Sequence, residues 1–152
     1  MLGLGNPILT DDGVGIHVVR DLAQRSPHQV LPAAVDVAEA SVGGLRLLER
    51  IAGYERVILV DAIQTQSGRP GDVYRLQAGD LCASLHSGCT HDLTLPGALA
   101  LGRGVGMQLP KDDDILIIAV EAEDVLTFGE LCTPQVQAAL PRAVQMVVDE
   151  IT

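Results

Sequence analysis

The chain has 152 residues, 47% hydrophobic and 20% charged, which suits one folded domain over residues 1–152. Ten basic and twenty acidic residues give a formal net charge of −10, so the chain is expected to repel nucleic acids and anionic membrane surfaces. No apolar run approaches the roughly 20 residues of a membrane-spanning helix, and three cysteines do not make a disulfide framework. We therefore expect a cytoplasmic protein, and a short domain without apolar excess favours a monomer.

Residues 1–4 predict a short first strand that enters a Gly-Asn-Pro turn at residues 5–7. A helix is expected to follow, with Asp11 or Asp12 as its N-cap. Apolar residues at helical spacing mark the buried face of this helix: Val14, Val18 and Leu22.

The rest of the chain predicts an alternation of strands and helices. Strands are expected over residues 35–38, 56–60, 71–77 and 114–120, the third of them at an edge of the sheet. Helices are expected from Ser41, as N-cap, to Gly53, over residues 93–101, and from Thr133-Pro134 onward. Pro141 is expected to kink or split the last helix.

The strands over residues 56–60 and 114–120 are almost wholly apolar, as expected of strands covered on both faces. The sequence therefore predicts an α/β fold, a three-layer α/β/α sandwich around a mostly parallel sheet. Ligands of such folds bind beyond the carboxyl ends of the parallel strands. We expect functional residues directly after the first, second, third and fifth strands.

Five polar residues stand at or near these positions. Asp61 follows a run of aliphatic residues, where a charge is costly unless it is paired, hydrogen-bonded or bound to metal. A single carboxylate suffices as the helix N-cap, so one of Asp11 and Asp12 is free to face the ligand-binding crevice beyond the carboxyl ends of the strands. Glu39 is either a surface carboxylate or an acceptor that orients a ligand or peptide. His91 is either a solvated loop residue or a ligand.

Together, Asp12, Asp61 and His91 offer two oxygen donors and one nitrogen donor for a divalent cation, with positions left for water or substrate. No G-x-S-x-G motif is present, which favours a metal-centred or carboxylate-centred hydrolase. The spacing of cysteine and histidine over residues 82–91 does not match a zinc knuckle.

Three segments resemble the hydrogenase maturation endopeptidases, which remove a C-terminal extension from the large subunit of nickel–iron hydrogenases. They are residues 5–15 (GNPILTDDGVG), residues 57–62 (VILVDA) and residues 90–93 (THDL). The resemblance extends to residues 39–48, 71–73 and 131–139. It implies a five-stranded, mostly parallel sheet with one antiparallel edge strand.

The resemblance also implies roles for individual residues. Asp12, Asp61 and His91 would bind nickel already inserted in the precursor, as a recognition signal, although another divalent cation also fits. Asp12, Asp61 and Glu39 are the candidate catalytic residues. Either the ion polarises the scissile carbonyl and activates water, or it only anchors the substrate while carboxylates carry out acid–base catalysis.

One departure and two alternatives accompany this resemblance. Relatives have several apolar residues before the glycine turn, whereas only Met1 and Leu2 precede Gly3 here, so either the given start lies a few residues late or the first strand is unusually short. A non-catalytic nickel-binding assembly factor would keep the same three ligands. The opening Gly3–Pro7 segment also looks like peptidyl-tRNA hydrolase, but residues 10–13 (TDDG) differ from that enzyme's next motif.

Overall fold

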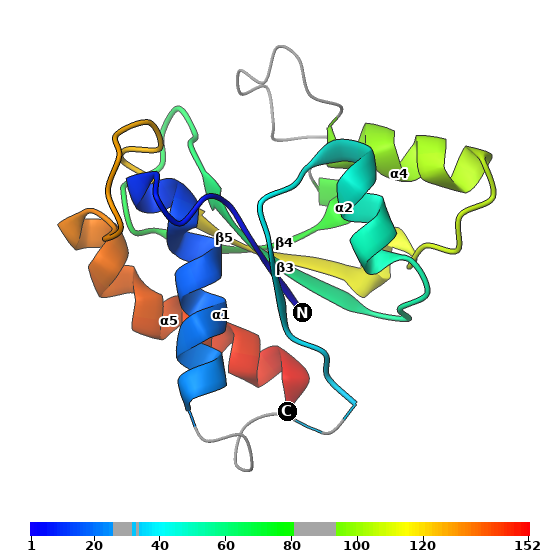
Figure 1. Ribbon diagram of the computed structural model, residues 1–152, viewed down its shortest axis with the longest axis horizontal. Helices are drawn as coiled ribbons and strands as arrows, with labels where there is room; N and C mark the ends of the chain where they lie inside the picture. Colours follow the sequence, from blue (N-terminus) through cyan, green and yellow to red (C-terminus); the bar gives the residue numbers. More distant parts are fainter. Residues whose placement is uncertain (26–31, 33, 81–93) are drawn as a thin grey trace.

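The computed structural model describes residues 1–25, 32, 34–80 and 94–152 (Figure 1). One sheet contains the strands β1 (Leu2–Leu4), β2 (Ala38–Ala40), β3 (Val57–Ile63), β4 (Val73–Gln77) and β5 (Ile115–Glu121). The α-helices of the described ranges are α1 (Val14–Gln24), α2 (Gly44–Ile51), α4 (Leu95–Gly104) and α5 (Pro134–Ile151). Short 3-10 turns are η1 (Thr10–Gly13), η2 (Ala78–Asp80) and η3 (Asp112–Asp114).

The strand order is β2-β1-β3-β5-β4, and every neighbouring pair is parallel except β4 and β5. Figure 1 shows α1 and α5 on one face of the sheet and α2 and α4 on the other. The predicted three-layer α/β fold with one antiparallel edge strand is confirmed. The first strand, β1, is three residues long.

Alternating side chains of the central strands fill two separate cores. Ile58 and Val60 of β3 face α1 and α5, where Val14, Val18 and Leu22 are buried as predicted. Val57 and Leu59 lie on the opposite face, in the core formed with α2 and α4. This period of two follows from the pleat of a strand and explains why β3 reads as continuously apolar.

Several local predictions were wrong. The second strand begins at Ala38 instead of residue 35, because its main chain pairs in register with β1, Leu2 opposite Ala38. Glu39 therefore lies inside this strand. Ser41 does not cap α2; its hydroxyl donates to the Gly5 carbonyl, 2.8 Å away. Pro141 does not split α5, and it lies on the exposed face, where water can hydrate the carbonyl that lacks a helical donor.

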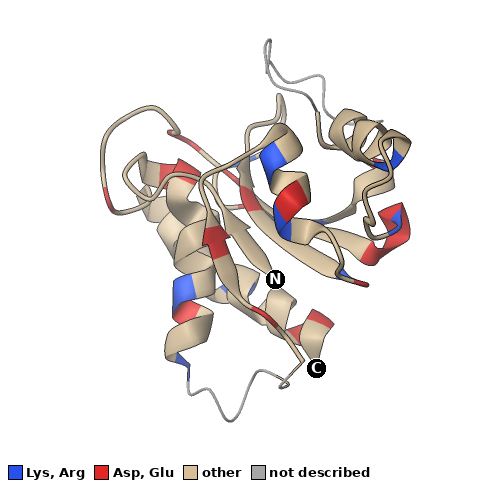
Figure 2. Ribbon diagram, turned by 45° about the vertical axis from the view of Figure 1, so that its right-hand side comes forward, with Lys and Arg blue, Asp and Glu red and all other residues tan. Residues whose placement is uncertain are grey.

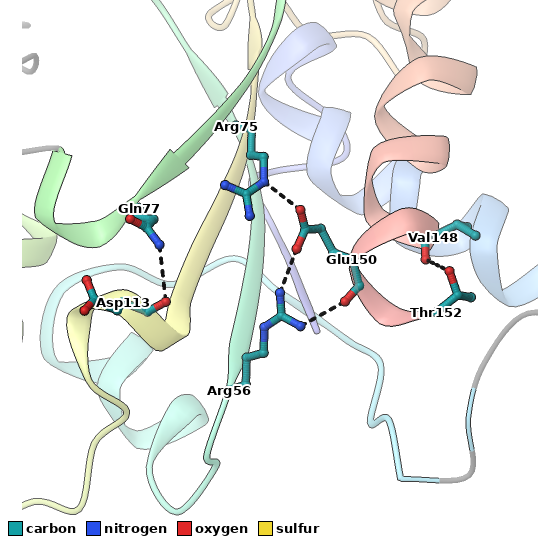
Figure 3. Close-up of polar contacts among 7 residues, drawn as sticks. All are labelled: Arg56, Arg75, Gln77, Asp113, Val148, Glu150 and Thr152. Atoms are coloured by element: carbon teal, nitrogen blue, oxygen red, sulfur yellow. Dashed lines mark hydrogen bonds and ion pairs between the residues drawn. The ribbon is translucent and has the colours of Figure 1, made fainter.

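Two arginines form ion pairs that join the C-terminal end of α5 to the sheet (Figure 3). One carboxylate oxygen of Glu150 accepts from Arg56 at 2.7 Å, and the other accepts from Arg75 of β4 at 2.6 Å. Arg56, which directly precedes β3, also donates to the Glu150 carbonyl at 3.0 Å. These arginines hold the pKa of Glu150 below its usual value, although partial burial opposes them.

Acidic residues are spread over most elements, and basic residues are fewer (Figure 2). None of the helices within the described ranges is long and apolar enough to cross a membrane.

Candidate active site

Asp61 lies in β3 directly after the buried run Val57–Val60, and the η1 turn that leads into α1 contacts this strand. Its Oδ1 accepts a hydrogen bond from the Ala62 amide at 2.8 Å, the one donor that reaches this carboxyl group within the described residues. Among the described residues, only one of the two Asp61 carboxyl oxygens accepts a hydrogen bond. One of its oxygens is left for a proton, a ligand or water.

Asp12 lies in η1, which contacts β3. Its Oδ2 accepts from the Asn6 amide at 2.8 Å, and α1 instead begins after Gly13 without a side-chain cap. The predicted capping role of Asp11 or Asp12 is wrong. The Asn6 amide fixes the Asp12 carboxylate over the turn that follows β1.

Two glycines allow this close packing. Gly5 adopts φ of +122°, and a Cβ there would lie 1.7 Å from the Asp12 carbonyl oxygen. A Cβ on Gly15 would lie 2.2 Å from the Val60 carbonyl oxygen and 2.4 Å from that of Leu4. Larger residues would push η1 and α1 away from the ends of β1 and β3, and so would separate Asp12 from Asp61.

The two carboxyl groups influence each other electrostatically. Burial raises the pKa of the Asp61 carboxyl to about 7, the Ala62 amide opposes this rise, and the negative charge of Asp12 adds to it. A carboxyl group with this pKa exists in both protonation states near neutral pH, and it can therefore exchange a proton in catalysis or lose it to bind a cation. The structure thus brings together two of the predicted site residues.

Glu39 has a different environment. Its two carboxylate oxygens accept from the Arg20 Nε and Nη2 atoms at 2.8 and 2.9 Å. This bidentate, solvent-exposed ion pair joins β2 to the middle of α1. The structure shows no contact of Glu39 with Asp12 or Asp61.

The third predicted ligand, His91, lies outside the described residues, as does the segment 82–91. Within the described ranges no three His, Cys, Asp or Glu side chains converge as a metal site. Asp12 and Asp61 fit a divalent cation chemically, because two carboxylates with free oxygens are hard donors. The predicted set of three stays a prediction.

The structural role of Asp11 could not be predicted from the sequence. It is completely buried, and four donors from the loop between β5 and α5 converge on it. The Glu123 and Asp124 amides donate to Oδ2 at 2.9 and 3.0 Å, and Thr133 donates through its amide and its hydroxyl at 2.7 and 2.9 Å. The adjacent acidic pair was the one sequence signal, and the sequence could not assign the two members to different tasks.

Comparisons with known proteins now identify the family. A model of the hydrogenase maturation protease family (HycI) matches residues 16–150. The chain belongs to the hydrogenase maturation protease family. Hydrogenase 2 maturation protease of Escherichia coli (strain K12) is 30% identical over 149 residues, which cover 97% of this chain and 87% of that protein.

Other members of this family and related proteins agree with this assignment. The structure of the hydrogenase maturating endopeptidase HybD from E. coli matches with a TM-score of 0.80 and 29% identity, over 98% of this chain and 88% of that one. Coenzyme F420 hydrogenase subunit delta of Methanothermobacter thermautotrophicus is 25% identical over 157 residues, covering 99% of this chain and 92% of that protein. As a member of this family, the chain is a hydrolase of the protease class, and the comparisons do not support peptidyl-tRNA hydrolase.

Proposed function

We propose that this chain is the endopeptidase that removes the C-terminal extension of a nickel–iron hydrogenase large-subunit precursor after nickel insertion. Membership of the hydrogenase maturation protease family supports the proposal. The observation that carries it is the pairing of Asp12 and Asp61 at the carboxyl end of the sheet, with the pKa of Asp61 raised to about 7 by burial.

The nickel of the precursor is the proposed recognition signal, and it belongs to the substrate. Asp12, Asp61 and His91 are its proposed ligands in this chain. Carboxylates must be deprotonated to bind a cation, so nickel would favour the ionised form of Asp61. A precursor without nickel would offer these carboxyl groups no cation to bind, and its peptide would be held less firmly.

For the chemical step we propose that a carboxylate assists the attack of water on the scissile carbonyl. The proposed acceptor of the water's proton is the Asp61 carboxylate oxygen that does not bind nickel. The Asp12 carboxyl group lies beside it, oriented by the Asn6 amide. Arg20 occupies both oxygens of Glu39, so we propose that Glu39 takes no part in the proton transfer and helps to orient the bound peptide.

The test compares nickel-loaded with nickel-free precursor, and mass spectrometry detects the released C-terminal peptide. We expect cleavage of the loaded precursor only, and none by Asp61→Ala. Glu55→Ala is the matched control, because Glu55 is exposed and lies just before the first residue of β3, at the end of the strand opposite to Asp61. Equal cleavage of both precursors would refute nickel recognition. Binding of loaded precursor without any cleavage would instead indicate the non-catalytic assembly factor.

A further inference from the structure

The loop between β5 and α5, residues 122–133, exposes large apolar side chains. Leu126 is 83% exposed, Phe128 is 80% exposed and Leu131 is 75% exposed. Ile8, in the turn that leads to η1, is 49% exposed. Single exposed apolar residues are ordinary, but several within one short loop mark an interaction surface.

Hydrogen bonds fix the backbone of this loop at both ends and near its middle. Its two ends are bonded to the buried Asp11 carboxylate. Near the middle, the Gly129 amide donates to the Ile8 carbonyl at 3.0 Å, and the Thr10 amide donates to the Gly129 carbonyl at 2.9 Å. Asp124 closes a turn by accepting from the Leu126 and Thr127 amides, each at 2.9 Å. The apolar side chains are therefore presented on a fixed backbone, which lowers the entropy cost of binding.

The same contacts join the loop to the candidate active site. Leu9 and Gly129 form a parallel bridge, and Asp12 follows three residues after Leu9. In Figure 1 the loop, in orange, lies beside the blue segment that leads into α1. A protein bound to the exposed side chains would therefore lie next to Asp12.

The charge around these side chains selects the partner. Glu123 and Glu130 are exposed in the loop, and residues 121–133 contain no Lys or Arg. Two copies of this chain would bring like charges together across such a surface, which disfavours self-association. A partner with apolar side chains flanked by Lys or Arg would be complementary.

We propose that Ile8, Leu126, Phe128 and Leu131 form the docking surface for the precursor, and that they bind an apolar segment of it flanked by basic residues. The proposal rests on the proposed function for the identity of the partner. Docking here places the precursor against the turn that carries Asp12. Binding energy from this surface is independent of nickel, which adds a second, separate requirement at the carboxylates.

The test uses Leu126→Gln/Phe128→Gln in the full chain and Leu101→Gln/Val105→Gln as its control. Leu101 and Val105 are also exposed apolar residues, at the far end of α4. We measure direct binding of the nickel-loaded precursor to each variant, and in parallel the KM and kcat of cleavage. The loop variant should bind at least tenfold more weakly and show a KM raised by a similar factor with kcat within twofold, while the control matches the wild type.

A second variant tests the charges. Glu123→Gln/Glu130→Gln should weaken binding severalfold at low salt, and this difference from the wild type should shrink as NaCl is raised.

The outcomes separate the two proposals. Loop-dependent binding with no cleavage by the wild type would overturn the proposed function and keep the docking surface. Nickel-dependent cleavage with unchanged affinity and KM in the loop variant would overturn the docking surface alone. Concentration-dependent dimers of the wild type in analytical ultracentrifugation, abolished in the loop variant, would assign the surface to a second copy and also overturn the proposal.

Discussion

Thr133 donates two hydrogen bonds to the buried carboxylate of Asp11, one from its amide to Oδ1 at 2.7 Å and one from its hydroxyl to Oδ2 at 2.9 Å. The contact joins the turn before α1 to the first residue before α5, across 122 positions of sequence. A single carboxylate thereby fixes the loop of residues 122–133 against the turn that carries Asp12.

Asp11→Asn should lower the free energy of unfolding by about 2–4 kcal/mol, because an amide offers one acceptor oxygen where four donors converge. Urea denaturation monitored by circular dichroism measures this change. Asp21→Asn serves as the control, since Asp21 forms an exposed ion pair with Arg25 and its loss should cost under about 0.5 kcal/mol. Equal stability of the two variants would show that Asp11 does not anchor the loop.

Asp61 should make the protein less stable as the pH rises from about 4 to 7. Its folded-state pKa of about 7 exceeds the ordinary 3.8, so the folded state holds its proton over this range while the unfolded state loses it. The loss amounts to about 1.4 kcal/mol per pH unit at most. Asp61→Asn has no such titration, so in EDTA its free energy of unfolding should exceed that of the wild type at pH 8 and converge with it at pH 4. A constant difference across this range would rule out the raised pKa.

The position of Asp61 could be predicted from the sequence because the signal is local. A carboxylate that follows four aliphatic residues is expected where the full burial of a strand ends, and Asp61 does follow the last fully buried residue of β3, although the strand continues to Ile63. The same reasoning gave the central strands β3 and β5 and the buried face of α1. These elements are defined by their own hydrophobic periodicity.

The second strand and the role of Asp11 could not be predicted, because both depend on distant partners. Residues 38–40 have no strong alternation, and their strand is fixed by main-chain bonds to β1, from the Ala38 amide to Met1 and from the Gly5 amide to Ala40. Asp11 is defined by amides more than 110 positions away. No local pattern encodes which of two adjacent carboxylates those amides will meet.

Glu150→Gln should destabilise the protein by about 1 kcal/mol at pH 7, because it removes the charge that both Arg56 and Arg75 neutralise. The arginines keep the folded-state pKa of Glu150 below 4.5, so this contribution is present above that pH and is lost as the pH falls through the folded-state value. Urea denaturation at pH 7 and pH 3 measures both effects. The control is Glu55→Gln, because Glu55 is exposed and adjacent to Arg56; its free energy of unfolding should equal that of the wild type at both values of pH. If Glu150→Gln also left the free energy of unfolding unchanged, the ion pairs of Glu150 would not contribute to stability.

The Cys132 thiol should be nearly unreactive in the folded protein. Burial, with a smaller contribution from the negative charge of Asp11, raises its pKa to about 11, so at pH 8 only about one thiol in a thousand is ionised. In a Cys82→Ser/Cys89→Ser background, iodoacetamide should modify the native chain at least about 100-fold more slowly than the urea-unfolded chain. Adding Asp11→Asn should accelerate native labelling, because it loosens the loop that covers the thiol, whereas Asp21→Asn should not. Native labelling as fast as that of the unfolded chain would contradict both the burial of Cys132 and the anchoring of its loop by Asp11.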